Sequence, residues 1–232
     1  MRFILLSLAV LALASCAAAP LAVDPTSDAP EFGPTSAAIG ELPSTYAEAL
    51  RLWQRPEDVN AWIGARFEYD VDRAARLSEN QRAAAQRVQI HSPEAFFAKP
   101  SGVCVDLARF AVEVLRTVAP ASKPSYLMIE FDPVVISGNT LRVHWISMFE
   151  RDGELYFFAD SKRPGHISGP YATVQQFIDR YSQDRKRRIV SYRSADSYER
   201  KPRQQAPKAT REERAPPLAP ADWLPRSATA RG

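Results

Sequence analysis

The sequence predicts an α+β fold in which several helices come before an antiparallel sheet. Two observations support this class. Apolar residues recur at helical spacing through the first half of the folded region, and the pattern changes to a period of two after residue 124. The composition fits a folded domain, because 45% of the 232 residues are hydrophobic and 25% are charged. These proportions exclude a fully disordered chain and a protein with many membrane spans.

Charge is distributed unevenly along the chain. The net charge is +3, but the segment from Arg185 to the end carries 13 basic and 5 acidic residues, whereas residues 1–184 carry 17 basic and 22 acidic residues. An acidic body with a basic tail is not typical of a nucleic-acid-binding domain, so we predict no nucleic-acid partner. The two cysteines are too few for a disulfide-rich scaffold or a cysteine-based structural zinc site.

Residues 1–15 are predicted to be a signal peptide. A positively charged start precedes an apolar run that is shorter than the about 20 residues of a membrane-spanning helix. The run ends in Leu13-Ala14-Ser15-Cys16, which resembles the lipobox of bacterial lipoproteins. The resemblance implies a lipid on Cys16 and a place in the cell envelope, and Ala17 favours the outer membrane, facing the periplasm. An ordinary cleaved signal with a chance cysteine is the alternative.

The folded domain is predicted to cover residues 44–194, between two proline-rich ends. Residues 16–43 contain five prolines and are expected to be a lipid-anchored, extended tether. Residues 195–232 contain six prolines and many cations, so we expect a disordered tail that could contact an anionic surface. About 150 residues between these ends are enough to bury a core.

Five helical segments are predicted before the sheet. Ser44 is expected to cap the first of them, and Pro56 suits the first turn of the second. A break at Pro100-Ser101-Gly102 precedes the segment with the broadest apolar stripe. The predicted segments are Tyr46–Gln54, Pro56–Phe67, Asp70–Val88, a short turn after Ser92 that carries Phe96 and Phe97, and Val103–Val118.

The rest of the domain is predicted to form the sheet. Alternating apolar residues indicate three strands, and a closing helix and an edge strand follow them. The predicted strands are Ser125–Phe131, Leu141–Phe149 and Glu154–Ala159, the helix is Thr173–Tyr181, and the edge strand is Arg188–Tyr192.

Cys104 lies at the expected start of the strongest helix, which packs on the sheet. If Cys16 carries lipid, Cys104 is the one thiol of the mature chain. The free backbone N–H groups and partial positive charge of a helix N-terminus favour a thiolate and can bind an oxyanion. The position therefore suits a catalytic nucleophile. A small buried residue at a helix start is the alternative.

A cysteine nucleophile also needs a base, and the chain has three histidines. His144 lies in the middle of a predicted strand, where a histidine is either a hydrogen-bonded core residue or a catalyst. His91 is expected on a loop, and His166 in a segment that flanks the cleft.

The turn after that strand decides which residue faces His144. A three-residue turn, Arg151-Asp152-Gly153, would place Asp160 directly opposite His144, where a carboxylate can orient an imidazole. A two-residue turn, Asp152-Gly153, would put the two side chains on opposite faces of the sheet. We expect the three-residue turn.

Three segments together resemble the transglutaminase-like superfamily, whose members have a papain-like core. They are Ser101–Ala108, His144-Trp145 and Gly153–Asp160. The separations of 40 residues from Cys104 to His144 and 16 from His144 to Asp160 are usual for that family. The resemblance covers about residues 62–181.

The resemblance implies a Cys–His–Asp triad. Cys104 would be the nucleophile, His144 the general base and then acid, and Asp160 the residue that orients His144. The oxyanion side chain of the family has no secure counterpart here, and Gln89 is a candidate. Asp106 is expected to be a solvated or capping residue.

The implied function is an amide hydrolase or acyltransferase that acts on a peptide or another amide-containing substrate of the cell envelope. We expect no cofactor, and no metal, because no acidic cluster resembles the calcium sites of animal transglutaminases. The run Arg185–Arg188 is expected to be a solvated face or a contact for anionic lipid or cell-wall polymers. A binding or scaffolding lipoprotein that keeps the fold without turnover is the alternative function.

Overall fold

The structure is a computed structural model that describes residues 28–31, 42–78, 88–136 and 139–199. It has the predicted α+β fold, with helices followed by a five-stranded antiparallel sheet. Among the described helices, none combines the length and the apolar content that a membrane span requires.

The helices that precede the sheet lie close to their predicted positions. Thr45, rather than Ser44, caps the first helix, because its hydroxyl accepts the Glu48 N–H at 3.2 Å while Ser44 donates to the Glu48 carboxylate. The third helix ends at Leu77, and residues 79–87 of the longer predicted helix lie outside the described residues. The elements are α1 Tyr46–Leu52, α2 Pro56–Arg66, α3 Val71–Leu77, α5 Pro93–Ala98, α6 Cys104–Val118 and the 3-10 helix η1 Pro120–Ser122.

The five-stranded sheet has the order β6-β5-β4-β3-β7, which confirms the predicted edge strand as β7. The β6 strand was not predicted, because it contains Gly169 and Pro170, residues typical of turns. A separate parallel pair joins the two short strands β1 and β2. The elements are β1 Glu68–Tyr69, β2 Ser101–Gly102, β3 Ser125–Ile136, β4 Asn139–Arg151, β5 Glu154–Phe158, β6 Ser168–Tyr171, α7 Val174–Arg185 and β7 Ile189–Ala195.

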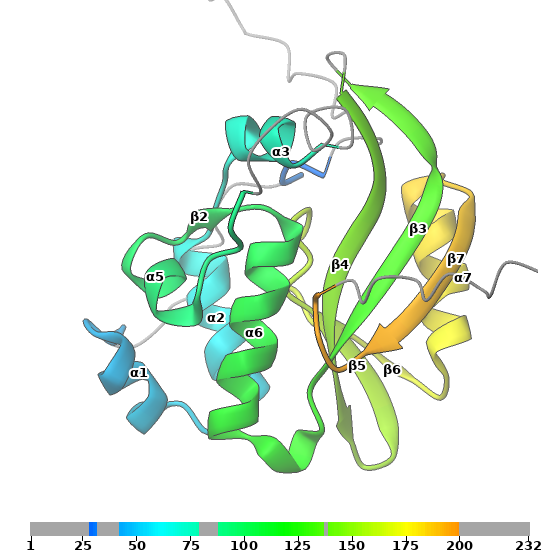
Figure 1. The fold of residues 1–232 in the computed structure, drawn as a ribbon. Coiled ribbons are helices and arrows are strands. Elements are labelled where there is room, and N and C mark those ends of the chain that lie inside the picture. The colour runs from blue at the N-terminus through cyan, green and yellow to red at the C-terminus, as the bar shows by residue number, and fades with distance from the viewer. Residues whose placement is uncertain (1–27, 32–41, 79–87, 137–138, 200–232) are drawn as a thin grey trace, which may run out of the picture. The chain divides into compact units, whose positions relative to one another are not determined.

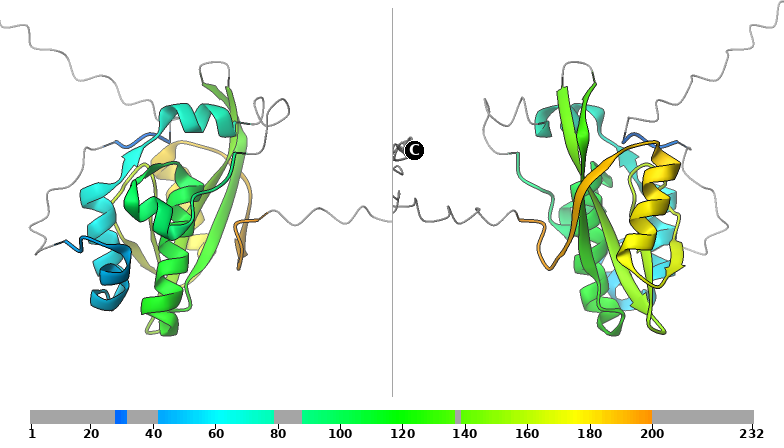
Figure 2. Two further views of the ribbon diagram at one scale, coloured as in Figure 1. Left: turned by 60° about the vertical axis from the view of Figure 1, so that its left-hand side comes forward. Right: turned by 90° about the vertical axis from the view of Figure 1, so that its right-hand side faces the viewer.

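Helices cover both faces of the sheet. Figures 1 and 2 show α6, with α1, α2 and α5 beyond it, on one side of the β3–β4 pair and α7 on the other. Neighbouring residues of β4 face these two layers in turn. The Ser147 hydroxyl donates to the Ala108 carbonyl of α6 at 3.1 Å, whereas Ile146 packs with Phe177 of α7. The sheet therefore brings α6 and α7 to opposite sides of the same strand.

The β4–β5 hairpin has a two-residue turn, so the prediction of a three-residue turn is wrong. Arg151 pairs with Glu154, and Asp152 and Gly153 have φ angles of 53° and 81°. Left-handed conformations at both positions are those of a type I′ turn, whose twist matches the flanking strands and which favours Asp-Gly. In this register, Ser147 is paired with Phe158. His144 and Asp160 are therefore not cross-strand neighbours.

Candidate active site

A buried carboxylate fixes the start of α6. Asp106 accepts hydrogen bonds from the backbone N–H groups of Val103 at 3.1 Å and His91 at 2.9 Å. Arg73 of α3 donates to both carboxylate oxygens, at 2.7 and 2.8 Å. A capping role for Asp106 is confirmed, but the side chain is fully buried rather than solvated. These bonds hold the turn that carries Cys104.

The chain that leads into α6 passes close to the same carboxylate. A Cβ atom at Gly102 would lie 2.9 Å from the Cβ of Asp106, so a larger residue there would displace the turn. The Gly102 carbonyl accepts the Asp70 N–H at 2.9 Å, and Asp70 caps α3. Cys104 is thus the first residue of a helix tied to α3 and β1, with its thiol free and the side chain half-buried.

His144 lies on β4, three residues before Ser147, the first residue of this strand that pairs with β5. It is fully buried, and its ring lies over Tyr181 of α7 with the centroids 6.0 Å apart and the planes 22° from parallel. Its Nε2 atom lies 3.2 Å from Oδ1 of Asp160. The structure therefore pairs the two residues that the sequence proposed, although the hairpin register does not place them opposite each other.

A left-handed residue makes this pairing possible. Ala159 has a φ angle of 56°, which ends the pleated alternation after Phe158 and turns the chain. Asp160 then begins a tight turn, in which its carbonyl accepts the Arg163 N–H and its Oδ1 accepts the Lys162 N–H, both at 3.0 Å. Because the strand has ended, the direction of the Asp160 side chain no longer follows the strand alternation.

Two opposing effects set the charge of the pair. Burial disfavours the carboxylate form of Asp160, but the Arg185 guanidinium, which donates to Oδ2, and His144 hold the pKa of Asp160 well below its usual value. Burial also lowers the pKa of His144, but Tyr181, Asp28 and Asp160 together hold that pKa well above its usual value. Since burial raises the pKa of Tyr181 to about 12, its hydroxyl is uncharged at neutral pH. The two carboxylates are therefore the charges that favour the protonated form of His144.

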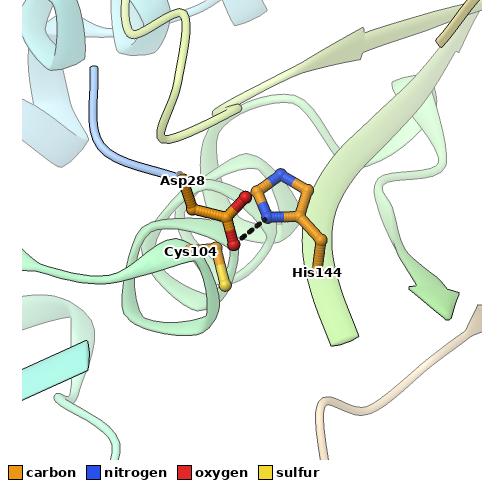
Figure 3. Close-up of side chains that lie close together, drawn as sticks. All are labelled: Asp28, Cys104 and His144. Atoms are coloured by element: carbon orange, nitrogen blue, oxygen red, sulfur yellow. Dashed lines mark ion pairs between the residues drawn. The ribbon is translucent and has the colours of Figure 1, made fainter. Parts of the chain in front are cut away.

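Asp28 is the site residue that the sequence did not reveal. It lies in the segment predicted as a tether, yet it is 5% exposed, and its Oδ2 atom lies 3.4 Å from Nδ1 of His144. Figure 3 shows the Asp28 carboxylate beside the Cys104 sulfur and the Nδ1 edge of the His144 ring. The side-chain donor atoms of these three residues lie within 4.8 Å of one another. No apolar period or motif marks a short acidic segment of this kind.

Sulfur, imidazole nitrogen and carboxylate oxygen are donors that Zn²⁺ accepts, so Asp28, Cys104 and His144 are the residues to consider for a metal. Their surroundings do not suit a cation. Arg187 lies 3.7 Å from Oδ1 of Asp28, and the Arg185 guanidinium reaches Asp160 on the other side of His144. The carboxylates of the site are therefore matched to protein cations.

The run Arg185–Arg188 is not the solvated face that the sequence suggested. Arg185 and Arg187 are 5% and 8% exposed, whereas Lys186 and Arg188 are exposed. Lys186 has a φ angle of 49° and ends α7 as its C-cap, so the chain changes direction between the two buried arginines. Both buried side chains point to the candidate site, where they contact Asp160 and Asp28.

Other residues singled out from the sequence lie around the site rather than in it. Gln89 is exposed, and its backbone carbonyl accepts a hydrogen bond from Arg73. The His91 N–H donates a hydrogen bond to Asp106, and His166 lines a pocket beside Asp160 and α7. Tyr69 of β1 was missed. Burial and the charges of Asp28 and Cys104 hold the pKa of Tyr69 well above its usual value, which places its hydroxyl in the same electrostatic environment.

The chain matches the sequence model of a known protein family. A family model described as a transglutaminase-like domain matches residues 51–189, more than half of the chain. The match contains Cys104, His144 and Asp160, and it begins after Asp28. No curated protein matches the chain.

Proposed function

We propose that this chain, which belongs to the family of transglutaminase-like domains, is a cysteine hydrolase or acyltransferase that acts on amide bonds. The observation that supports this most directly is the position of the His144 ring. Its Nε2 edge lies 3.2 Å from Asp160, and its other edge faces Cys104. This is the order that nucleophilic catalysis requires, with a base between the nucleophile and an orienting carboxylate.

The first step would form an acyl-enzyme. The Cys104 thiolate attacks the amide carbonyl carbon, and the oxyanion that develops is stabilised by backbone N–H groups at the start of α6. His144 then gives its proton to the amine, which leaves as the C–N bond breaks and a thioester remains on Cys104. Asp160, held by Arg185, keeps the imidazole oriented and stabilises its charged form.

The second step would release the acyl group. Water, or a second amine in acyl transfer, gives a proton to His144 and attacks the thioester carbonyl. The C–S bond breaks, the Cys104 thiolate is restored, and the product is an acid or a new amide. The residues of the site are the same for both outcomes, so the acceptor decides between hydrolysis and transfer.

The test is amide turnover by the full chain. We expect the protein to release an amine from at least one of three substrates: a peptide mixture, peptidoglycan fragments or a glutamine-containing peptide. Cys104→Ser should abolish release and leave the melting temperature unchanged, because sulfur and oxygen differ little in volume. Cys16→Ser changes the other cysteine and is the matched control, which should keep the activity. Release that survives in Cys104→Ser would contradict the proposal.

A binding or scaffolding protein is the second candidate, because the domain could keep its fold without turnover. Its signature would be an inert thiol. If no amide is cleaved, and iodoacetamide alkylates Cys104 of the Asp28→Asn variant at pH 7 no faster in the folded chain than in the urea-unfolded chain, the scaffold function replaces the enzyme.

We further propose that the domain is anchored to a membrane of the cell envelope through a lipid on Cys16. The support is the Leu13–Cys16 lipobox and the apolar run before it. Asp28 lies twelve positions after Cys16, so the site would lie within about 43 Å of the anchor, at about 3.6 Å per residue. The basic tail would contact an anionic surface nearby.

The anchor is tested by acylation. Cys16→Ala should abolish incorporation of labelled palmitate, and globomycin should leave an uncleaved precursor. If the unchanged protein carries no lipid and Cys16→Ala is processed to a soluble form, the anchor is excluded.

A further inference from the structure

We propose that residues 28–31, Asp-Ala-Pro-Glu, occupy the catalytic centre as an intramolecular mimic of an acidic peptide substrate. Arg187 and Lys162 then form the subsite that receives the carboxylates of the true substrate. The inference rests on the proposed function, because it identifies the substrate class of the same site. It predicts an amide substrate with a carboxylate close to the bond that is cleaved.

The segment is bound in the way an extended peptide is bound. The Asp28 carbonyl accepts the Ser161 hydroxyl at 3.3 Å, and the Glu31 N–H donates to the Lys162 carbonyl at 3.0 Å. Backbone contacts at both ends fix the segment along the turn that follows β5. A substrate peptide could make the same contacts, because they depend on main-chain atoms of the segment.

Cations hold the two acidic side chains of the segment. Asp28 lies 3.7 Å from Nη1 of Arg187. Glu31 lies 3.6 Å from Nζ of the buried Lys162 and 3.3 Å from Nε of Arg163. With Asp28 and Glu31 away, the cations at this turn would lose these carboxylate partners. The site would then favour an incoming anion.

Arg187 is the strongest indication of a ligand subsite. Its side chain is 6% exposed, and its Nε and Nη2 atoms have no hydrogen-bond partner within the described part of the chain. The guanidinium lies over the Phe131 ring, with Cζ 4.2 Å from the centroid, and this contact helps to hold the side chain in place. A buried guanidinium with unused donors is costly unless an anion reaches it, and a carboxylate can accept two of its N–H groups. Asp28 supplies the charge at a distance longer than a hydrogen bond.

The occupied state is not competent for catalysis. Asp28 lies at Nδ1 of His144, the ring nitrogen that faces Cys104, so the imidazolium pairs with Asp28 in place of the thiolate. The Asp28 carboxylate also lies beside the Cys104 sulfur, within 4.8 Å, in the space that a substrate carbonyl would need. Attack on a substrate therefore requires Asp28 to leave, and a substrate carboxylate bound at the unused Nε and Nη2 donors of Arg187, away from His144, would assist this step.

Tethering makes the segment a substantial competitor. Ten residues separate Glu31 from Leu42, the next described residue. Because the segment belongs to the same chain as the site, its concentration there does not depend on the concentration of the protein. A substrate must therefore bind well enough to displace a ligand that is always present, which selects against amides without a matching carboxylate.

The test compares two alkylating agents of nearly equal size. Iodoacetate is an anion and iodoacetamide is neutral, so the ratio of their rates at Cys104 reports the charge of the subsite. The full chain is used, and mass spectrometry of the Cys104 peptide gives both rates without requiring turnover. Asp28→Asn should raise the rate with iodoacetamide by about tenfold, and should raise the iodoacetate-to-iodoacetamide ratio by a similar factor, equivalent to about 1.4 kcal/mol.

Variants of the subsite complete the experiment. Arg187→Gln in the Asp28→Asn background should return the ratio toward its original value, whereas Arg187→Lys should keep part of the gain. Arg188→Gln and Asp132→Asn are the matched controls. These two side chains are 77% and 50% exposed and pair with each other, so their substitution should change neither rate. Glu31→Gln should raise both rates less than Asp28→Asn does.

The outcomes separate this inference from the proposed function. If Asp28→Asn slows alkylation, Asp28 is a positioning residue for His144, and the inference is wrong. If Asp28→Asn leaves the rate ratio unchanged while Cys104 stays reactive, the subsite is excluded and the enzyme stands. If Arg187→Gln does not fold, the Asp28→Asn comparison decides alone. A chelator during alkylation should have no effect, and a large increase in rate would indicate a bound metal in place of the ion pairs.

Discussion

The Nε2 atom of His144 lies 3.2 Å from the Asp160 carboxylate, although the hairpin register does not pair the two residues. If the strand continued, its alternation would put the side chain of Asp160 on the face of the sheet opposite that of His144. Ala159 changes this, because its left-handed conformation ends the strand before Asp160. The pairing therefore depends on the backbone at position 159 rather than on cross-strand geometry.

Substitutions at Ala159 test this dependence. Ala159→Gly should leave the melting temperature nearly unchanged, because glycine adopts the φ angle of 56° without strain while a small buried methyl group is lost. Ala159→Val should lower the free energy of unfolding by roughly 1–3 kcal/mol, since a β-branched residue is strained there and the site is fully buried. Ala172→Val, at an exposed position, is the control. Equal melting temperatures for the valine and glycine variants at position 159 would contradict the explanation.

Asp160→Asn should weaken catalysis without abolishing it. The amide keeps the shape but cannot stabilise an imidazolium, so we expect kcat to fall by roughly 10²-fold, within the range that general acid–base catalysis contributes. Cys104→Ser should have the larger effect, because the cysteine reacts and Asp160 orients. Asp184→Asn is a matched control, since this carboxylate lines the same pocket and pairs with Arg180. A kcat for Asp160→Asn equal to that of the unchanged enzyme would remove Asp160 from the triad.

The fold was largely accessible from the sequence, because local signals define its parts. Proline positions and an apolar stripe predicted α2 and α6, and the alternation of apolar residues predicted β3 and β4. The hairpin turn was misjudged, because Asp152-Gly153 suits both turn lengths considered. The pairing of His144 with Asp160 was nevertheless anticipated from the spacing of the family motifs. The other ground for expecting this pair, a three-residue turn, is not found in the structure.

The rest of the site depends on contacts that no local pattern encodes. Asp28 reaches His144 across 116 positions of the chain, from a proline-rich segment with no periodicity. Arg185 and Arg187 lie in a basic run that resembles a solvated face. Their burial follows from the end of α7 at Lys186, which separates the two side chains from their exposed neighbours. Only the folded chain shows that these charges meet.

The stability of the domain should depend on pH through His144 and Asp160. The folded pKa of His144 lies above the ordinary value of 6.5, so its contribution is fully present below about pH 6.5 and is lost as the pH rises through the folded value. The folded pKa of Asp160 lies below the ordinary value of 3.8, so its contribution is present above about pH 3.8 and is lost as the pH falls through the folded value. Between these limits both contributions are complete.

Thermal melts across pH measure this directly. The difference in melting temperature between the unchanged protein and His144→Gln should be largest at pH 5–6 and should shrink as the pH rises above about 6.5. In Asp160→Asn, part of the decrease in melting temperature below about pH 3.8 should disappear. A difference for His144→Gln that stays constant from pH 5 to pH 10 would show that His144 is not held in its charged form.

Arg73 is expected to be the residue outside the triad on which the site depends most. It is 7% exposed and donates twice to the fully buried Asp106, the carboxylate that fixes the turn before Cys104. Arg73→Ala leaves that carboxylate without its charge partner, and breaking a buried pair in this way costs about 3–5 kcal/mol. Urea denaturation should show this loss, and alkylation of Cys104 should change with it, because the start of α6 moves. Arg76→Ala, on the exposed side of the same helix, should change the free energy of unfolding by no more than about 0.5 kcal/mol. If the two variants are equally stable, the Asp106 cap is held by its backbone donors alone, and α3 has no part in positioning Cys104.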